Sequence, residues 1–287
     1  MTERLSDVEQ RLASVHQLEL VVNAMRGVAA SRSREARERL PAIRAYADTV
    51  GNAIGEALAL VPEDGRVAGG RPAPGKHVLI VLCAEQGFVG AFNNRVLAAA
   101  ESALESGRTE LLLAGDRGLM VAAERGLAVA WSSAMPAHID DCPALANRLA
   151  DAVYDRLTDG ATRVTIVHAT PTASMATEIV VRTLVPLDLG RFPISRRPIP
   201  PLITQEPGRL IQQLADEYMF AELSEAVILS FAAENIARMH AMIAARDNVE
   251  NKLGELDGLF RRLRQEGVTN EIVELAAGAA TESGDSP

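Results

Sequence analysis

One turn near the middle of the chain has the composition of a phosphate-binding loop. Gly87 and Gly90 lie in the segment 85–93, which reads EQGFVGAFN and directly follows the apolar run 77–84. Glycines at a strand-to-helix turn leave backbone N–H groups free to bind phosphate. The segment matches neither GxGxxG nor a Walker loop, because it has no Gly-Lys-Ser/Thr. A tight turn alone would explain both glycines, so a nucleotide-binding enzyme using the 85–93 turn stands as one alternative.

The other reactive side chains are scattered along the sequence. None of the histidines has metal-ligand spacing to another histidine or to a cysteine, and no Ser-His-Asp or Cys-His arrangement is evident. The acidic pairs Glu222 with Glu225 and Glu271 with Glu274 are each about one helical turn apart. Such pairs more often lie on a solvated helix face than form a catalytic dyad. We therefore predict no catalytic residue, no cofactor and no metal site.

A band of arginines near the N-terminus is the strongest charge feature. The segment 26–44 holds six arginines against Glu35 and Glu38, in a chain of net charge -9. This local excess is either an ordinary solvated helix face or a basic band that meets an acidic patch on a protein partner. The arginines are Arg26, Arg32, Arg34, Arg37, Arg39 and Arg44.

The C-terminal third predicts one very long helix. No proline occurs between Arg209 and Leu275, and apolar residues recur at helical spacing. Apolar residues there are alternately four and three positions apart, a spacing typical of a coiled coil. They are Val249, Leu253, Leu256, Phe260 and Leu263. At ~1.5 Å per residue, such a helix is on the order of 100 Å long, which exceeds the width of a compact domain of this mass. This length favours an architectural role over pocket chemistry.

The N-terminal residues 1–60 predict a second long helix, with a kink or break near 37–41 because Pro41 interrupts its backbone hydrogen bonds. We expect the two long helices (1–60 and 209–280) to pair as an antiparallel coiled coil. Residues 77–187 alternate strand-like and helix-like segments, which predicts an inserted Rossmann-like α/β domain with mostly parallel strands. The proline-rich segment 188–208 should be an extended connection back to the C-terminal helix.

Composition excludes several classes of protein. A net charge of -9 and a pI of about 5.2 do not favour a nucleic-acid partner. Two cysteines, Cys83 and Cys142, are too few for a disulfide scaffold. No apolar run reaches ~18 residues, so we expect no membrane-spanning segment.

Three parts of the chain resemble the gamma subunit of F-type ATP synthases. The segment 237–248, ARMHAMIAARDN, is similar to the family's C-terminal signature, and Gly278-Ala279-Ala280 continues it. The N-terminal segments 11–15 and 24–32 resemble the family's first helix. The 85–93 turn resembles the family's Asp-Arg-Gly-Leu-x-Gly-Gly-Leu-Asn turn in altered form. These matches occur in family order and cover nearly the whole chain.

The resemblance implies a central rotor stalk that is not itself an enzyme. It implies a coiled coil of the two terminal helices inside a ring of alpha and beta subunits, with the α/β domain at the foot, near the epsilon subunit and the c-ring. The chain would be peripheral to the cytoplasmic side of a bacterial inner membrane. Carried over by the resemblance, the rotor–stator contacts are Met25, Arg32, Arg238, Gln265, Thr269, Glu271 and Glu274.

The chain departs from the family pattern at several of these places. Where the family has two lysines before Ala-Met, this chain has the segment 17–23, QLELVVN, and Gln86 replaces the arginine of the turn. We interpret the chain as a member of a divergent bacterial branch, whose coupling ion the sequence leaves open. The alternatives are a non-enzymatic coiled-coil scaffold with an α/β head, and the nucleotide-binding enzyme described above.

Overall fold

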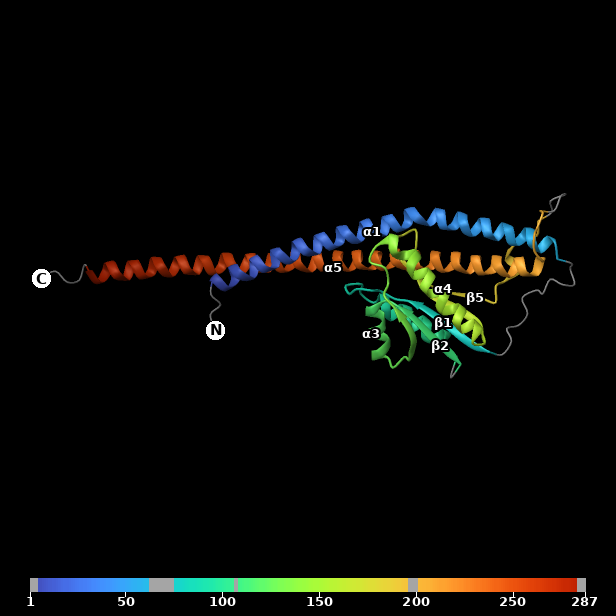
Figure 1. The fold of residues 1–287 in the computed structure, drawn as a ribbon. Helices are drawn as coiled ribbons and strands as arrows, with labels where there is room; N and C mark the ends of the chain where they lie inside the picture. Colours follow the sequence, from blue (N-terminus) through green and yellow to red (C-terminus); the bar gives the residue numbers. More distant parts are fainter. Residues whose placement is uncertain (1–4, 62–74, 106–107, 196–200, 283–287) are drawn as a thin grey trace. The chain divides into compact units, whose positions relative to one another are not determined.

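The computed structural model describes residues 5–61, 75–105, 108–195 and 201–282. They form two compact units, one made of residues 1–27 with 241–287 and the other of residues 28–240. Two long helices contribute to both units: α1, Leu5–Ala59, and α5, Pro207–Glu282. These helices run antiparallel (Figure 1). The expected pairing of the terminal helices around an inserted α/β domain is therefore confirmed.

Helix α1 continues through Pro41, so of the two predicted alternatives, a kink or a break, the break is wrong. Proline removes one backbone hydrogen bond, and its ring crowds the carbonyl group four residues back. The helix is held by packing on both sides of Pro41, because Ala36 and Leu40 before the proline are buried in the core of the larger unit and Ile43 after it packs against that core. Tertiary contacts thus outweigh the local cost of the proline.

In the smaller unit, the predicted apolar seam of α5 faces inward. Val249 and Leu256 are buried, whereas the residues between them are mostly exposed. From α1, Val8 and Val22 are buried in the same unit. The periodicity of the sequence therefore predicted the correct contact face of this segment.

The larger unit contains a five-stranded sheet of order β3-β2-β1-β4-β5. The first four strands are parallel, and β5 pairs antiparallel with β4. The central strand β1 is buried on both faces, as its continuous apolar run predicted. The strands are β1 Lys76–Leu82, β2 Thr109–Ala114, β3 Val129–Ser133, β4 Ala161–Pro171 and β5 Thr177–Val185.

Two hydrophobic cores cover the two faces of this sheet. On one face Leu79 and Val81 pack with residues of α2, Phe92–Ala103, and α3, Asp116–Glu124. On the other face Ile80 and Leu82 pack with α4, Cys142–Thr158, and with parts of α1 and α5. Alternate residues of β1 point to opposite faces, so one strand contributes to both cores.

A short segment after β5 leads back toward α5. It contains the 3-10 turn η3, Leu189–Arg191, and then Phe192, whose ring meets Tyr218 edge-on at 4.9 Å. Phe192 and Tyr218 share a small core with Val50 and Ile54 of α1. This core fixes the entry of the chain into α5; part of the predicted connection, 196–200, lies outside the described residues.

Candidate functional site

The turn between β1 and α2 carries two residues in unusual backbone conformations. Phe88 has φ +60° and Gly90 has φ +56°. The left-handed region costs glycine little but is unfavourable for a bulky side chain such as phenylalanine. The Phe88 side chain is nevertheless exposed. The turn must therefore be held in place by contacts of its backbone rather than of this ring.

A buried ion pair on α5 supplies those contacts. Arg238 Nη2 lies 2.6 Å from Glu234 Oε1, and the two side chains are 7% and 5% exposed. Arg238 also donates to the carbonyl oxygens of Gln86 and Gly87, at 3.5 and 3.4 Å. Glu234 in turn accepts hydrogen bonds from the backbone amides of Glu85 and Gln86. Burial raises the pKa of the Glu234 carboxyl, and the charge of Arg238 opposes that shift.

This arrangement bears on the nucleotide-binding alternative. A phosphate bound at the 85–93 turn would need hydrogen bonds from the first backbone N–H groups of the turn. The amides of Glu85 and Gln86 already donate to Glu234, a carboxylate of the same chain. An anionic side chain thus takes the place that an anionic ligand would need, which argues against a nucleotide site here.

The side chain of Glu85 ties the same turn to its neighbours. Its Oε2 atom accepts from the backbone amides of Asp116 at 3.2 Å and Met135 at 2.7 Å. These amides belong to the start of α3 and to the segment after β3. A carboxylate at a helix N-terminus is favoured by the helix dipole. Glu85 therefore has a structural role at the carboxyl ends of the parallel strands.

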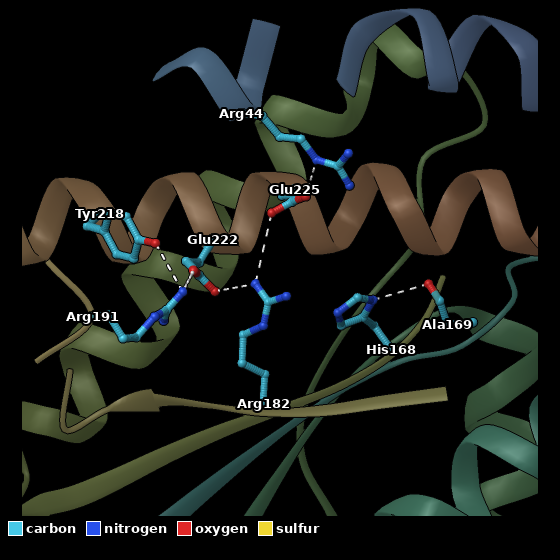
Figure 2. A network of polar contacts seen from close by, with 8 residues as sticks. All are labelled: Arg44, His168, Ala169, Arg182, Arg191, Tyr218, Glu222 and Glu225. Atoms are coloured by element: carbon cyan, nitrogen blue, oxygen red, sulfur yellow. Dashed lines mark hydrogen bonds and ion pairs between the residues drawn. The ribbon is translucent and has the colours of Figure 1, made fainter. Parts of the chain in front are cut away.

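A second set of charged residues joins α5 to the edge of the sheet (Figure 2). Glu222 Oε2 lies 2.6 Å from Arg182 of β5, and Glu222 Oε1 lies 3.1 Å from Arg191 of η3. Glu225 binds Arg44 of α1 at 2.7 Å and lies 3.9 Å from Arg182. We name this set the ion-pair joint; it consists of Arg44, Arg182, Arg191, Glu222 and Glu225.

The prediction that Glu222 and Glu225 lie on a solvated helix face is wrong. Glu222 and Glu225 were expected on a solvated face, but their side chains are 6% and 15% exposed. Burying a carboxylate is unfavourable unless it is paired, and here the arginines provide the partners. The one available signal in the sequence was the position of both glutamates inside an otherwise apolar stretch of α5.

Electrostatics within the joint favour ionised glutamates. Burial alone would raise the pKa of the Glu222 carboxyl, but the hydrogen bond and charge of Arg182 and the charge of Arg191 outweigh it. The pKa of Glu222 consequently lies below its ordinary value. Beside the joint, burial lowers the pKa of His168, whose ring Nδ1 lies 3.1 Å from the carbonyl oxygen of Ala169.

The residues taken from the family resemblance lie in both units. Gln265, Thr269 and Glu271 are exposed on α5, and Met25 is half-buried on α1, all in the smaller unit. Thr269 Oγ1 donates to the carbonyl oxygen of Gln265 at 2.8 Å, as is usual for a helical threonine. The side chain of Glu274 lies outside the described residues.

In the larger unit, Arg32 and Arg238 differ sharply. Arg32 is half-buried on α1, and the structure gives it no hydrogen bond or ion pair with any described residue. Arg238, by contrast, is buried and binds Glu234. A direct contact between Arg238 and another subunit would require this buried pair to open.

The arginine band is partly used within the chain. Arg37 donates to the carbonyl oxygen of Ser33, Arg39 pairs with Asp140 at 3.0 Å, and Arg44 belongs to the ion-pair joint. Half of the six arginines therefore bind described residues of the same unit. All three side chains are nevertheless exposed to solvent, so both a solvated helix face and a contact surface for a partner stay open.

The described residues contain no cluster suited to metal binding, and neither cysteine is a reactive thiol. They include no group of three or more His, Cys, Asp or Glu side chains that could hold a metal ion. Both cysteines are buried, and burial raises the pKa of each thiol to about 12. Buried His77 lies between the hydroxyl groups of Thr109 and Thr165, at 3.2 and 3.0 Å, which is a satisfied structural environment.

Among the described residues, one helix is by length and composition apolar enough to cross a membrane, although the sequence predicted no membrane-spanning segment. An 18-residue stretch within Pro207–Val273 of α5 has a mean hydropathy of 1.2. Of this stretch, 72% is buried inside the molecule. Its side chains pack against β1 and α4 in the core of the larger unit. The apolar character of α5 is explained by this packing.

Comparison with known proteins connects this architecture to one family. The family model described as ATP synthase matches residues 4–281. An ATP synthase gamma chain of Solibacter usitatus is 26% identical over 286 residues, covering 96% of this chain and 98% of that protein. One of Cupriavidus necator is 28% identical over 285 residues, with 96% and 98% covered.

Solved structures share the fold at lower sequence identity. A chain of the Euglena gracilis mitochondrial ATP synthase, described as OSCP/F1/c-ring, has a TM-score of 0.67 and 12% identity, with 99% of this chain and 96% of that chain covered. A chain of the Tetrahymena thermophila mitochondrial ATP synthase, described as central stalk/c-ring, has a TM-score of 0.55 and 18% identity, with 78% and 99% covered.

Proposed function

Because the chain belongs to the ATP synthase gamma-chain family, as a non-catalytic component of the central stalk, we propose that it carries rotation between a membrane-embedded c-ring and a head of alpha and beta subunits. Ion flow would turn the ring, and the chain would turn with it. The changing face of the helices would then drive each beta subunit through different nucleotide affinities. The catalytic residues would lie on those neighbouring subunits.

The observation that carries this proposal is the pairing of the long helices α1 and α5 around an inserted α/β domain (Figure 1). Helix α5 alone has 76 residues, whereas helices of globular proteins average only about 10–14. Helices of this length suit transmission of force between partners better than the enclosure of a substrate.

We further propose that exposed polar residues of the smaller unit form part of the contact with the head. Gln265 and Thr269 are exposed one turn apart on α5, and Glu271 is exposed nearby. Exposed polar and ionic contacts are typically worth less than ~1 kcal/mol each. Such contacts can form and break in every rotation without holding the shaft in one orientation. Met25 and Glu274 of the smaller unit are further proposed contacts with the head, and in the larger unit Arg32 and Arg238 are proposed contacts by the same resemblance.

The α/β domain would meet the epsilon subunit and the c-ring. In that assembly the chain would lie on the cytoplasmic side of a bacterial inner membrane, peripheral to the bilayer. The identity of the coupling ion would be determined by the ring and not by this chain.

The test is reconstitution with the alpha and beta subunits of the same organism. With the head fixed to a surface and a bead attached to the α/β domain, ATP should drive stepwise rotation, and the chain alone should hydrolyse no ATP. The double variant Gln265→Ala/Thr269→Ala should reduce the stall torque, whereas Glu250→Ala, which removes an exposed pair with Arg246, should not. ATP turnover by the isolated chain, or a complex that hydrolyses ATP without rotation of the bead, would contradict the proposal.

A further inference from the structure

Within the larger unit, four acidic side chains of α5 bind residues of other structural elements. Asp216 accepts a hydrogen bond from Tyr154 of α4, and Glu217 accepts one from Tyr46 of α1 at 2.6 Å. One and two turns later, Glu222 and Glu225 form the centre of the ion-pair joint. Helix α5 is therefore the element to which α1, α4, β5 and η3 are all connected by directional polar contacts.

Apolar packing alone would leave the position of α5 loosely defined. The face of α5 that meets the sheet includes small residues such as Ala226 and Ala232 beside Leu223 and Val227. Hydrophobic burial is non-directional, so the buried apolar area by itself does not select one angle of α5. A buried ion pair, in contrast, has a fixed geometry and can select one register among several.

The joint has the connectivity needed for this selection. Arg182 of β5 touches both carboxylates, Glu222 at 2.6 Å and Glu225 at 3.9 Å. Glu225 continues to Arg44 of α1, and Glu222 continues to Arg191 beyond the end of β5. As Figure 2 shows, the charges alternate in sign from α1, over α5, to the edge of the sheet. A twist of the sheet against either helix would have to lengthen at least one of these contacts.

We infer that the ion-pair joint sets the angular position of the α/β domain on α1 and α5 and stiffens the domain against twist. The inference rests on the proposed rotor function, because stiffness matters when torque enters at the domain and leaves through the helices. Arg44, Arg182, Arg191, Glu222 and Glu225 are positioning residues in this account. A loosened joint would allow the domain to turn through a larger angle before the helices follow.

The test measures angular fluctuation in the assembled complex. The head is fixed, and a gold nanorod is attached through Ala98→Cys, an exposed position on α2 away from the joint. During the pauses between ATP-driven steps, the variance of the rod angle reports torsional stiffness. For Glu222→Gln/Glu225→Gln we expect a variance about twofold larger than in the parent, because the neutral amides lose the charge-assisted bonds. ATP hydrolysis should remain unchanged, and ATP-driven ion pumping per ATP should fall.

Two further variants separate stiffening from simple stabilisation. Arg44→Gln removes only the contact to α1, and Arg44 is 58% exposed, so this variant should fold and still broaden the fluctuation. The conservative change Arg44→Lys keeps the positive charge opposite Glu225 and should leave the variance near the parent value. Glu250→Gln removes an exposed pair elsewhere on α5 and should leave the variance at the parent value.

The outcomes distinguish the inference from the function on which it rests. If the parent complex rotates and both Arg44→Gln and the double variant show parent-like variance, the joint does not stiffen the rotor and the inference is wrong. If the parent complex hydrolyses ATP but the rod does not rotate, the proposed function itself fails. If Arg44→Lys broadens the variance as much as Arg44→Gln does, the inference is also wrong, because the effect would then come from lost packing and not from lost charge.

Discussion

The guanidinium of Arg238 and the carboxylate of Glu234 form a buried pair, 2.6 Å apart, beneath the turn that follows β1. Each partner also bonds the backbone of that turn, Glu234 as an acceptor and Arg238 as a donor. A helix of the stalk is thereby connected to the carboxyl end of the central strand. This pair has stability consequences that differ from those of an exposed rotor contact.

Replacing Arg238 should destabilise the chain as well as change any contact with other subunits. Arg238→Ala leaves the Glu234 carboxylate buried without its cation, and breaking a buried pair in this way costs about 3–5 kcal/mol. Urea unfolding of the purified chain, followed by circular dichroism, measures the loss. Arg246→Ala, which breaks an exposed pair on the same helix, should cost less than about 1 kcal/mol. Equal midpoints for the two variants would show that the buried pair contributes little.

The stability contributed by Glu222 should depend on pH with a defined sign. Its pKa is lowered in the folded state from an ordinary value of 4.5, so the stabilisation is fully present above pH 4.5 and is lost as pH falls through the folded pKa. At pH 7, Glu222→Gln should cost about 2 kcal/mol, within the range for hydrogen bonds to charged groups.

The measurement is the difference in free energy of unfolding between the parent chain and Glu222→Gln from pH 7 to pH 3. The difference should be constant down to about pH 5 and should shrink at lower pH, where the unfolded carboxyl binds a proton first. A difference that grows on acidification would mean that the carboxylate is not stabilised by Arg182 and Arg191.

The architecture was predictable because periodic patterns determine it. The seam from Val249 to Leu263 repeats every three to four residues, and the run 77–84 is apolar throughout, so each could be assigned to a helix or a buried strand. The continuity of α1 at Pro41 could not be predicted from the spacing of apolar residues. Its cause is burial of Ala36 and Leu40 by residues far away in the sequence.

The candidate site was less predictable for the same reason. Glu222 and Glu225 resemble a solvated pair until Arg44, Arg182 and Arg191 are brought to them from other parts of the chain. Local spacing carries no information about such partners. The resemblance to a family likewise indicated Arg238 as a contact residue, but only the structure shows that Glu234 holds it inside the larger unit.

Both native thiols should be inert toward alkylation in the folded chain. Burial raises the pKa of Cys83 and of Cys142 to about 12, and the thiolate is the reactive form. Iodoacetamide at pH 8 should therefore modify neither residue, although both should react in 6 M guanidinium, about the concentration that unfolds most domains. Mass spectrometry of tryptic peptides gives the extent of labelling, and exposed Ala98→Cys provides the positive control. Rapid labelling of Cys83 in the native chain would show that its strand opens readily.

A methyl group at Gly118 should disrupt the packing of α3 on β1. A Cβ built there would lie 2.0 Å from the Cβ of Cys83, whereas one at Gly87 would meet nothing within 4 Å. Gly118→Ala must push α3 away from the central strand, and overpacking of this kind costs about 1–3 kcal/mol. Gly87→Ala, in the neighbouring turn, should change stability by less than about 0.5 kcal/mol. The measurement is the thermal unfolding temperature of Gly118→Ala and of Gly87→Ala. A Gly118→Ala chain as stable as the parent would mean that α3 can shift at no cost in free energy.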